Sequence, residues 1–168
     1  MRIGTNDAIM HPRALNLRDL IEHRSLLLFG PQQTGKSTLV RQTFPEAAVY
    51  DLLEADTYRE LTARPEYLRQ TLEPSRRVVI IDEIQKCPAL LDEVHLLIER
   101  NRALRFVLTG SSARKLKRGG SNLLGGRARV ARLHPLTSSE VNHRRMLDRL
   151  NRGSLPAILD APEFTEDL

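Results

Sequence analysis

A glycine-rich segment, Gly30–Ser37, with the sequence GPQQTGKS separates a short apolar run from a segment with helical periodicity. It matches the pattern G-x-x-x-x-G-K-[ST], in which glycines let the backbone curl so that amide N–H groups face inward. The apolar run Leu26–Phe29 precedes it, and the helical segment Thr38–Phe44 follows it. A helix that starts here adds its N-terminal donors and its dipole to the same anion site. The sequence therefore predicts a phosphate-binding loop between a strand and a helix.

The residue types within this loop predict a nucleotide phosphate site with a magnesium ion. The ammonium of Lys36 can reach the β- and γ-phosphates, and the hydroxyl of Ser37 can ligate Mg²⁺, which takes oxygen ligands. We expect the nucleotide to be held by Gly30, Pro31, Gln32, Gln33, Thr34, Gly35, Lys36, Ser37 and Thr38.

Two carboxylates end a second apolar run, Val78–Ile81. Asp82 and Glu83 follow it directly, and a carboxylate at the end of a parallel strand beside the loop strand points into the ligand crevice. We expect Asp82 to hold Mg²⁺ and Glu83 to orient and deprotonate an attacking water. The alternative is a solvated acidic pair at the start of a turn.

Five short apolar runs alternate with helical segments, which predicts βαβ units and a parallel sheet covered on both faces. The interval between Lys36 and Asp82 has room for a further strand and helix. This predicts an α/β, three-layer P-loop NTPase fold of the ASCE type, with strand order 5-1-4-3-2. The expected strands are Leu26–Phe29, Ala47–Leu52, Val78–Ile81, Phe106–Thr109 and Val130–Leu133.

The run Phe106–Thr109 ends in hydroxyl side chains, and an arginine precedes the last expected strand. Thr109 or Ser111 is expected to face the γ-phosphate and hold the attacking water, unless the segment is an ordinary turn. Arg127 follows two glycines and could neutralise charge on the transferring phosphoryl group, in cis or in trans. The alternative for Arg127 is a solvated side chain.

The basic residues exceed the acidic ones by 26 to 21, and only four of the 26 are lysine. A net charge of +5 permits a nucleic-acid partner without requiring one. Residues 113–126 contain four glycines and no acid, which predicts a mobile loop with one short helical turn. A cationic run without acidic residues begins in this loop and comprises Arg114, Lys115, Lys117, Arg118, Arg127, Arg129 and Arg132. This run could bind nucleic acid, and the alternative is a solvated basic face.

No apolar run approaches the length of a membrane span, and the N-terminus has no apolar signal-peptide core. One cysteine excludes an internal disulfide, so we expect a cytoplasmic protein without membrane contact.

The segment from Thr137, TSSEVNHRRMLDRL, predicts a capped helix. We therefore divide the chain into a P-loop core with an N-terminal helix, 1–136, and a C-terminal helix with the start of a truncated connection, 137–168.

Four motifs together resemble the AAA+-like prokaryotic P-loop ATPases with a DEIQ Walker B motif. They are DEIQKCPALL (82–91), FVLTGSS (106–112), LLGGR (123–127) and LHPLT (133–137) with Glu140. The resemblance extends from about Leu15 to Leu159. The resemblance implies ATP binding with Mg²⁺ and hydrolysis of ATP. It also implies a C-terminal domain that is missing here, so we expect this chain to be a fragment or a truncated gene product.

Gln32 and Thr34 stand where family members commonly have arginine and valine. Because backbone amides make most of the phosphate cradle, we expect binding to persist, whereas any role of that arginine is lost.

These observations predict a module that binds Mg–ATP, hydrolyses it to ADP and phosphate, and couples hydrolysis to movement of the loop 113–126. Such a module could act as a homo-oligomer or together with a partner protein. Two alternatives remain open. One is a nucleotide-dependent binding module with little or no turnover, and the other is a DNA-associated regulator. A P-loop kinase is the weakest alternative, since no acceptor site is visible.

Overall fold

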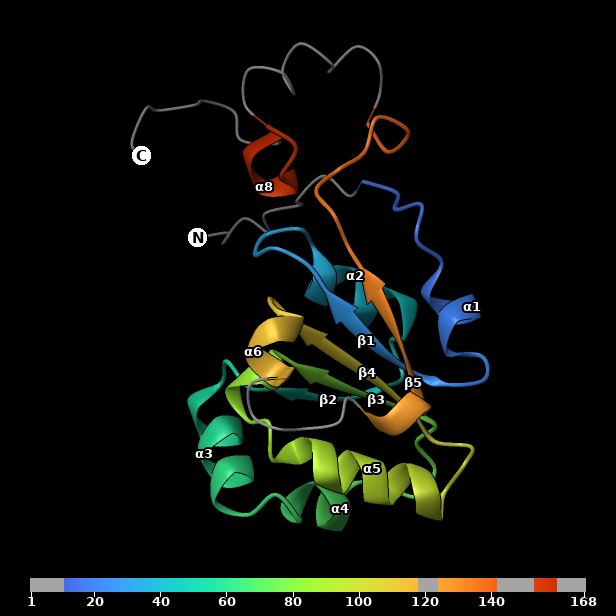
Figure 1. The fold of residues 1–168 in the computed structure, drawn as a ribbon, viewed down its shortest axis with the longest axis vertical. Helices are drawn as coiled ribbons and strands as arrows, with labels where there is room; N and C mark the ends of the chain where they lie inside the picture. The colour runs from blue at the N-terminus through green and yellow to red at the C-terminus, as the bar shows by residue number, and fades with distance from the viewer. Residues whose placement is uncertain (1–10, 118–123, 142–152, 160–168) are drawn as a thin grey trace, which may run out of the picture.

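The computed structural model describes residues 11–117, 124–141 and 153–159. The elements follow one another as a parallel α/β protein (Figure 1). In chain order they are α1 (Leu17–Ile21), β1 (Ser25–Phe29), α2 (Lys36–Thr43), β2 (Ala48–Asp51), α3 (Ala55–Ala63), α4 (Tyr67–Thr71), β3 (Val78–Asp82), the 3-10 turn η1 (Ile84–Lys86), α5 (Leu90–Arg100), β4 (Arg105–Gly110), α6 (Ala113–Lys117), the 3-10 turn η2 (Leu124–Gly126), β5 (Ala128–Arg132) and α8 (Pro156–Leu159).

The five strands form one sheet in the order β2-β3-β4-β1-β5, and every neighbouring pair is parallel. Read from the other edge, this is the predicted order 5-1-4-3-2. The expected fold class, with β4 inserted between the loop strand and the acidic strand, is therefore confirmed. The expected strands agree with the observed ones to within two residues at each end.

Alternate residues of the strands face two separate apolar layers because side chains along a strand point to opposite faces. On one face, Leu26 and Leu28 of β1 pack with Leu17 of α1 and Val40 of α2. On the other face, a larger cluster joins the sheet to α3, α4, α5 and α6. Figure 1 shows these helices on the two sides of the sheet.

The parallel arrangement gives the sheet two chemically different edges. The carboxyl ends of β1, β3 and β4 lead into Gly30, Glu83 and Ser111, while the amino ends of β1 and β5 begin at Ser25 and Ala128. With about 3.3 Å per residue, the five-residue strand β1 separates the two edges by about 16 Å. The predicted phosphate-binding loop therefore lies far from the start of β5, which Arg127 directly precedes.

Two predicted segments extend beyond the described residues. In the segment from Thr137, where a helix was predicted, residues 137–141 form a turn, and the remainder lies outside the described residues. In the predicted loop 113–126, α6 and η2 occupy the two ends, and residues 118–123 lie outside the description. Within the described part of the chain, no helix is long and apolar enough to cross a membrane.

Candidate functional site

The loop Gly30–Ser37 leaves β1 at the carboxyl edge and runs directly into α2, as predicted. Its first residue is tightly enclosed. The Gly30 N–H donates to the carbonyl of Gly110 at 3.2 Å, and the Leu133 N–H donates to the carbonyl of Phe29 at 2.7 Å. A Cβ at Gly30 would overlap the Leu133 carbonyl oxygen, so only glycine lets the chain after β5 lie against the start of the loop.

Gly35 turns the loop into the helix. It is the N-cap residue of α2, with φ +82° and ψ +22°, in the left-handed region that favours glycine. A Cβ at Gly35 would meet no atom within 4 Å, so its requirement is conformational and not steric. Gly126, in η2 at the other edge of the sheet, has the same properties, with φ +80° and open space around the Cβ position.

These two glycines provide a matched pair of substitutions. Gly35→Ala and Gly126→Ala should each lower the free energy of unfolding by about 1–2 kcal/mol, because both place a Cβ in the left-handed region. Only Gly35→Ala should also weaken nucleotide binding, since only Gly35 belongs to the loop. Urea denaturation and nucleotide titration of both variants check this, and equal binding by the two variants would contradict it.

Lys36 is buried at the base of the loop, with 5% of its surface exposed. Its Nζ donates to the carbonyl oxygens of Gly30 at 2.9 Å and Pro31 at 2.7 Å. Burial lowers the pKa of Lys36, and the negative charges of Glu83 and Asp82 oppose that shift. The lysine is thus within electrostatic range of both predicted carboxylates.

Asp82 ends β3 with 2% of its surface exposed. The hydroxyl of Thr109, on the neighbouring strand β4, donates to its Oδ1. Arg41 of α2 approaches the Oδ2 of Asp82 at 3.9 Å and pairs with Asp51 of β2 at 2.6 Å. Asp51 and Asp82 are register partners on adjacent strands, so one arginine lies between two carboxylates at this edge.

Glu83 follows in the left-handed region with φ +59°, which turns its side chain away from the line of the strand. Its backbone N–H donates to Thr109 Oγ1 at 3.2 Å. The amide of Gln85 donates to the Glu83 carboxylate and, at 3.2 Å, to Ser111 Oγ. Both candidate hydroxyls thus lie beside the acidic pair, Thr109 in direct contact and Ser111 through Gln85.

The remaining residues predicted to hold the nucleotide are on the surface of the loop and the first turn of α2. Pro31, Gln32, Gln33 and Thr38 are exposed, and Ser37 is half-buried. Thr34 differs because it is fully buried. Its hydroxyl donates to the carbonyl of Pro31 at 2.9 Å, so a polar side chain fills this interior position without an unpaired hydroxyl.

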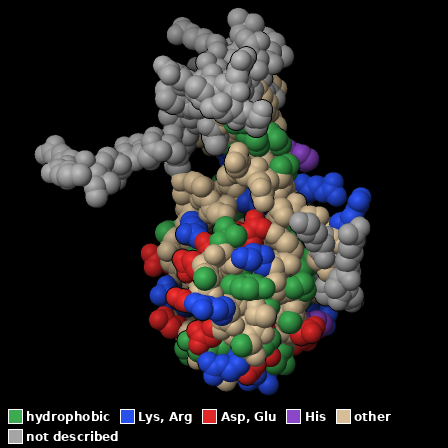
Figure 2. Space-filling view, turned by 90° about the vertical axis from the view of Figure 1, so that its left-hand side faces the viewer, with side chains coloured by type: hydrophobic (Ala, Val, Ile, Leu, Met, Phe, Trp, Pro, Cys, Tyr) green, Lys and Arg blue, Asp and Glu red, His purple; other side chains and the backbone are tan. Residues whose placement is uncertain are grey.

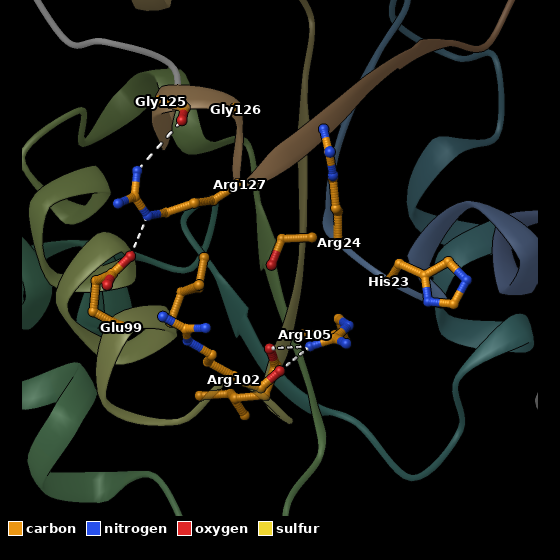
Figure 3. A pocket seen from close by; sticks show the side chains of 11 residues that line it. His23, Arg24, Glu99, Arg102, Arg105, Gly125, Gly126 and Arg127 are labelled. Atoms are coloured by element: carbon orange, nitrogen blue, oxygen red, sulfur yellow. Dashed lines mark hydrogen bonds and ion pairs between the residues drawn. The ribbon is translucent and has the colours of Figure 1, made fainter.

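Arg127 is not part of this cluster. It precedes β5 at the amino edge, where its carbonyl accepts from the Ser25 N–H at 3.1 Å. Its guanidinium pairs with Glu99 of α5 and donates to the Gly125 carbonyl at 3.3 Å, as Figure 3 shows. This pairing lowers the pKa of Glu99. The residue lines a hollow of about 470 Å³ together with Arg24 and other basic side chains.

The predicted cationic run is not gathered on one surface within the described residues. Arg129 and Arg132 are both exposed on β5, but three positions apart on a strand they point to opposite faces. Arg114 lies on α6, and Arg118 and the side chains of Lys115 and Lys117 lie outside the description. Over the lower part of the face shown in Figure 2, basic and acidic side chains are intermixed.

A buried ion pair, which the sequence analysis did not predict, lies behind the loop. Arg13 Nε donates to Glu140 Oε1 at 3.1 Å, and the two side chains are 7% and 5% exposed. Arg13 also donates to the carbonyl oxygens of Thr34, at 2.7 Å, and His134, at 2.6 Å. We call Arg13 and Glu140 the clasp, because they join the chain before β1, the loop and the chain after β5.

The Glu140 carboxylate accepts three hydrogen bonds in the clasp. Besides Arg13, the backbone N–H groups of Ala14 and Thr137 donate to it at 2.8 and 2.9 Å. Burial tends to raise its pKa, but these hydrogen bonds outweigh burial and lower the pKa from 4.5 to about 2. The carboxylate is therefore charged at neutral and mildly acidic pH.

This shift predicts a pH-dependent stability difference. The native state holds the Glu140 proton less tightly than the unfolded chain, so the contribution of the carboxylate is complete above about pH 5 and lost as the pH falls towards 2. The difference in urea midpoint between the wild type and Glu140→Gln should be largest at pH 7 and should narrow below pH 4.5. A difference that stays constant from pH 7 to pH 3 would contradict this.

The sequence analysis also missed three contributors at the carboxyl edge, namely Arg41, Asp51 and Gln85. Asp51 had a signal in the sequence, because the predicted sheet order makes it the neighbour of Asp82. Gln85 belongs to the DEIQ motif, but the motif assigned it no role at the site. Arg41, five residues after Lys36, had no comparable signal, since its side-chain direction depends on tertiary packing.

One comparison with known proteins identifies the family. A protein-family model described as an AAA domain matches residues 22–142, which include the loop, both acidic residues, Thr109 and Glu140. No curated protein matches the chain significantly. The matched segment is most of the chain and contains all five strands of the sheet. The chain therefore belongs to the AAA domain family and is a nucleotide-binding ATPase module of the P-loop class.

Proposed function

We propose that this module binds Mg–ATP along the carboxyl edge of the sheet and hydrolyses it to ADP and phosphate. The observation that carries the proposal is that Asp82, Glu83 and Thr109 lie together at that edge, within electrostatic range of Lys36 in the glycine loop. ATP rather than GTP as the substrate follows from the resemblance to AAA+-like ATPases.

The donor set at this edge fits a magnesium-bound triphosphate. Gly35 and the first turn of α2 offer N–H groups to phosphate, and Lys36 adds the positive charge. Ser37 and Asp82 offer the hydroxyl and carboxylate oxygens that Mg²⁺ prefers. Among the described residues no group of three or more His, Cys, Asp or Glu could hold a metal alone, so phosphate and water oxygens would complete the coordination. When bound, Mg²⁺ would neutralise charge on the phosphates.

Glu83 is the proposed general base. Its backbone is held by Thr109 and its carboxylate by Gln85, so two neighbouring elements fix its position. In this role Glu83 would accept the proton of a water molecule that attacks the γ-phosphate. Thr109 and Ser111 are the two candidates to orient that water, since the Thr109 hydroxyl contacts Asp82 and the Ser111 hydroxyl is bonded to Gln85.

The contacts of Gln85 provide a route by which hydrolysis could change the conformation of the segment 113–126. Gln85 connects Glu83 to Ser111, and Ser111 stands two residues before α6. A change in the position of Glu83 would therefore alter the hydrogen bonding at the entry to α6. We propose that this segment moves with the state of the nucleotide.

Any role of Arg127 in charge neutralisation would be in trans. Arg127 lies at the amino edge, about 16 Å from the loop along β1, which exceeds the reach of an arginine side chain. A second copy of the chain could present Arg127 to the site of the first. Phosphate release per chain should then rise with protein concentration in the wild type and not in Arg127→Ala.

Isothermal titration with ATP, GTP and ADP, with and without Mg²⁺, together with a phosphate-release assay, tests the proposed function. We expect Mg²⁺-dependent binding of ATP and slow release of phosphate. Binding without any release would support a nucleotide-dependent binding module instead. No nucleotide binding, together with salt-sensitive DNA binding, would support a DNA-associated regulator.

A further inference from the structure

The clasp contacts the loop at a single peptide group, Thr34–Gly35. Arg13 Nη1 donates to the Thr34 carbonyl oxygen at 2.7 Å. No peptide bond among the described residues is cis, and in a trans peptide the C=O and the following N–H point in opposite directions. The hydrogen bond from Arg13 thus fixes the plane of this peptide and turns the N–H of Gly35 away from Arg13.

We propose that Arg13 is a positioning residue for nucleotide binding, that it presets the phosphate-contacting N–H of Gly35, and that Glu140 holds Arg13 in place. The inference rests on the proposed nucleotide site. It adds a requirement outside the loop motif, supplied by one residue before β1 and one after β5.

The need for such a device follows from the conformation of Gly35. Glycine visits many backbone conformations, and a cradle of amides binds an anion well only when the amides are already aligned. Within the described residues, Thr34 is held from two sides, by its own hydroxyl bond to Pro31 and by the bond from Arg13 to its carbonyl. The first bond fixes the side chain, and the second fixes the peptide that leads into Gly35.

Glu140 holds Arg13 in place through a buried ion pair. The Arg13 side chain is almost completely buried, and besides the Thr34 carbonyl its guanidinium donates to Glu140 and to the carbonyl of His134. The backbone N–H groups of Ala14 and Thr137 bond the same carboxylate and hold both chain segments around it. Charge-assisted hydrogen bonds between buried charged partners favour a single geometry, whereas the loss of either partner leaves an uncompensated buried charge.

The clasp also links the nucleotide site to the chain after β5. Arg13 bonds His134, Glu140 bonds Thr137, and the Leu136 N–H donates to the Ser154 carbonyl at 2.7 Å. If the clasp favours nucleotide binding, then by thermodynamic linkage bound nucleotide favours the clasped arrangement of residues 134–140 to the same degree. Residues 134–140 thereby respond to nucleotide occupancy.

The test measures separately the KM and the kcat of folded variants and compares each with the wild-type value. Arg13→Gln should raise the KM for ATP and the Kd for ADP roughly 10-fold to 100-fold, the loss typical of one charge-assisted hydrogen bond, with kcat within about two-fold of wild type. Arg18→Gln is the matched control. Arg18 donates to the Thr43 carbonyl at 2.6 Å, at the far end of α2, so its loss should leave both KM and kcat unchanged.

A double variant keeps the test decisive if Arg13→Gln does not fold. Arg13→Gln with Glu140→Gln contains no unpaired buried charge, and it should show the same rise in KM, because the pair acts as one unit. A folded single or double variant with wild-type KM and Kd would overturn the inference while the wild type still binds nucleotide. A wild type that binds no nucleotide would overturn the proposed function instead.

Discussion

Replacing Glu83 with Gln is expected to reduce phosphate release at least roughly 100-fold while ATP binding is retained, because a positioned general base contributes about 10²–10⁴ in rate. Glutamine has the size of glutamate but cannot accept a proton from water. The backbone contact of residue 83 with Thr109 does not depend on the side chain, so the site should keep its geometry.

Glu93→Gln is the control for this substitution. Glu93 is a half-buried glutamate on α5 that pairs with Arg69 at 3.2 Å, away from the carboxyl edge. Its loss should cost at most about 1 kcal/mol of stability and leave turnover unchanged. Equal phosphate release by the wild type and Glu83→Gln would assign the proton transfer to another group or show that the module binds without turnover.

The second large effect is expected for Lys36→Ala. Removing the ammonium deletes the positive charge proposed to contact the β- and γ-phosphates, and it leaves the carbonyls of Gly30 and Pro31 without their donor. Loss of a charge-assisted contact together with disorder in the loop should weaken ATP binding by roughly 100-fold or more. Displacement of a fluorescent ATP analogue measures this loss.

Lys86→Ala provides the comparison, because Lys86 is an exposed lysine that lies over the ring of Tyr58 at 4.7 Å. It has the same charge as Lys36 but no place in the loop, so its removal should leave the affinity unchanged. If both variants bound ATP like the wild type, Lys36 would not contact the nucleotide.

The architecture was predictable from the sequence because its signals are local. Apolar runs such as Val78–Ile81 are too short for helices and end in turn or polar residues, and each one became a strand. The loop motif predicted the order of strand, loop and helix, and the interval between Lys36 and Asp82 had room for a further strand. The predicted order of the sheet is the one typical of P-loop NTPases of the ASCE type.

The clasp was not predictable in the same way. Arg13 and Glu140 are 127 positions apart, and each has an ordinary local explanation. Glu140 fits a helix-capping pattern with Thr137, and the structure contains that bond, but the same carboxylate also receives Arg13. Only the folding of β5 beside β1 brings the two segments behind the loop together.

Arg127 is a predicted site residue that the structure places away from the rest of the site. Two glycines before an arginine suggested that Arg127 could move to the phosphates, either of its own chain or of a second copy. Strand direction favours the second of these, because a residue that precedes a parallel strand lies at the amino edge. The predicted parallel sheet already implied this position for a residue that precedes the last strand.

Amide chemical-shift changes during titration of the ¹⁵N-labelled chain with Mg–ATP test most directly whether a magnesium-bound triphosphate binds at the carboxyl edge of the sheet. Binding there should give the largest changes at Gly30–Thr38, with further changes at Asp82 and Thr109. Changes centred on the amino-edge hollow at Arg24 and Arg127, with the loop unaffected, would contradict it.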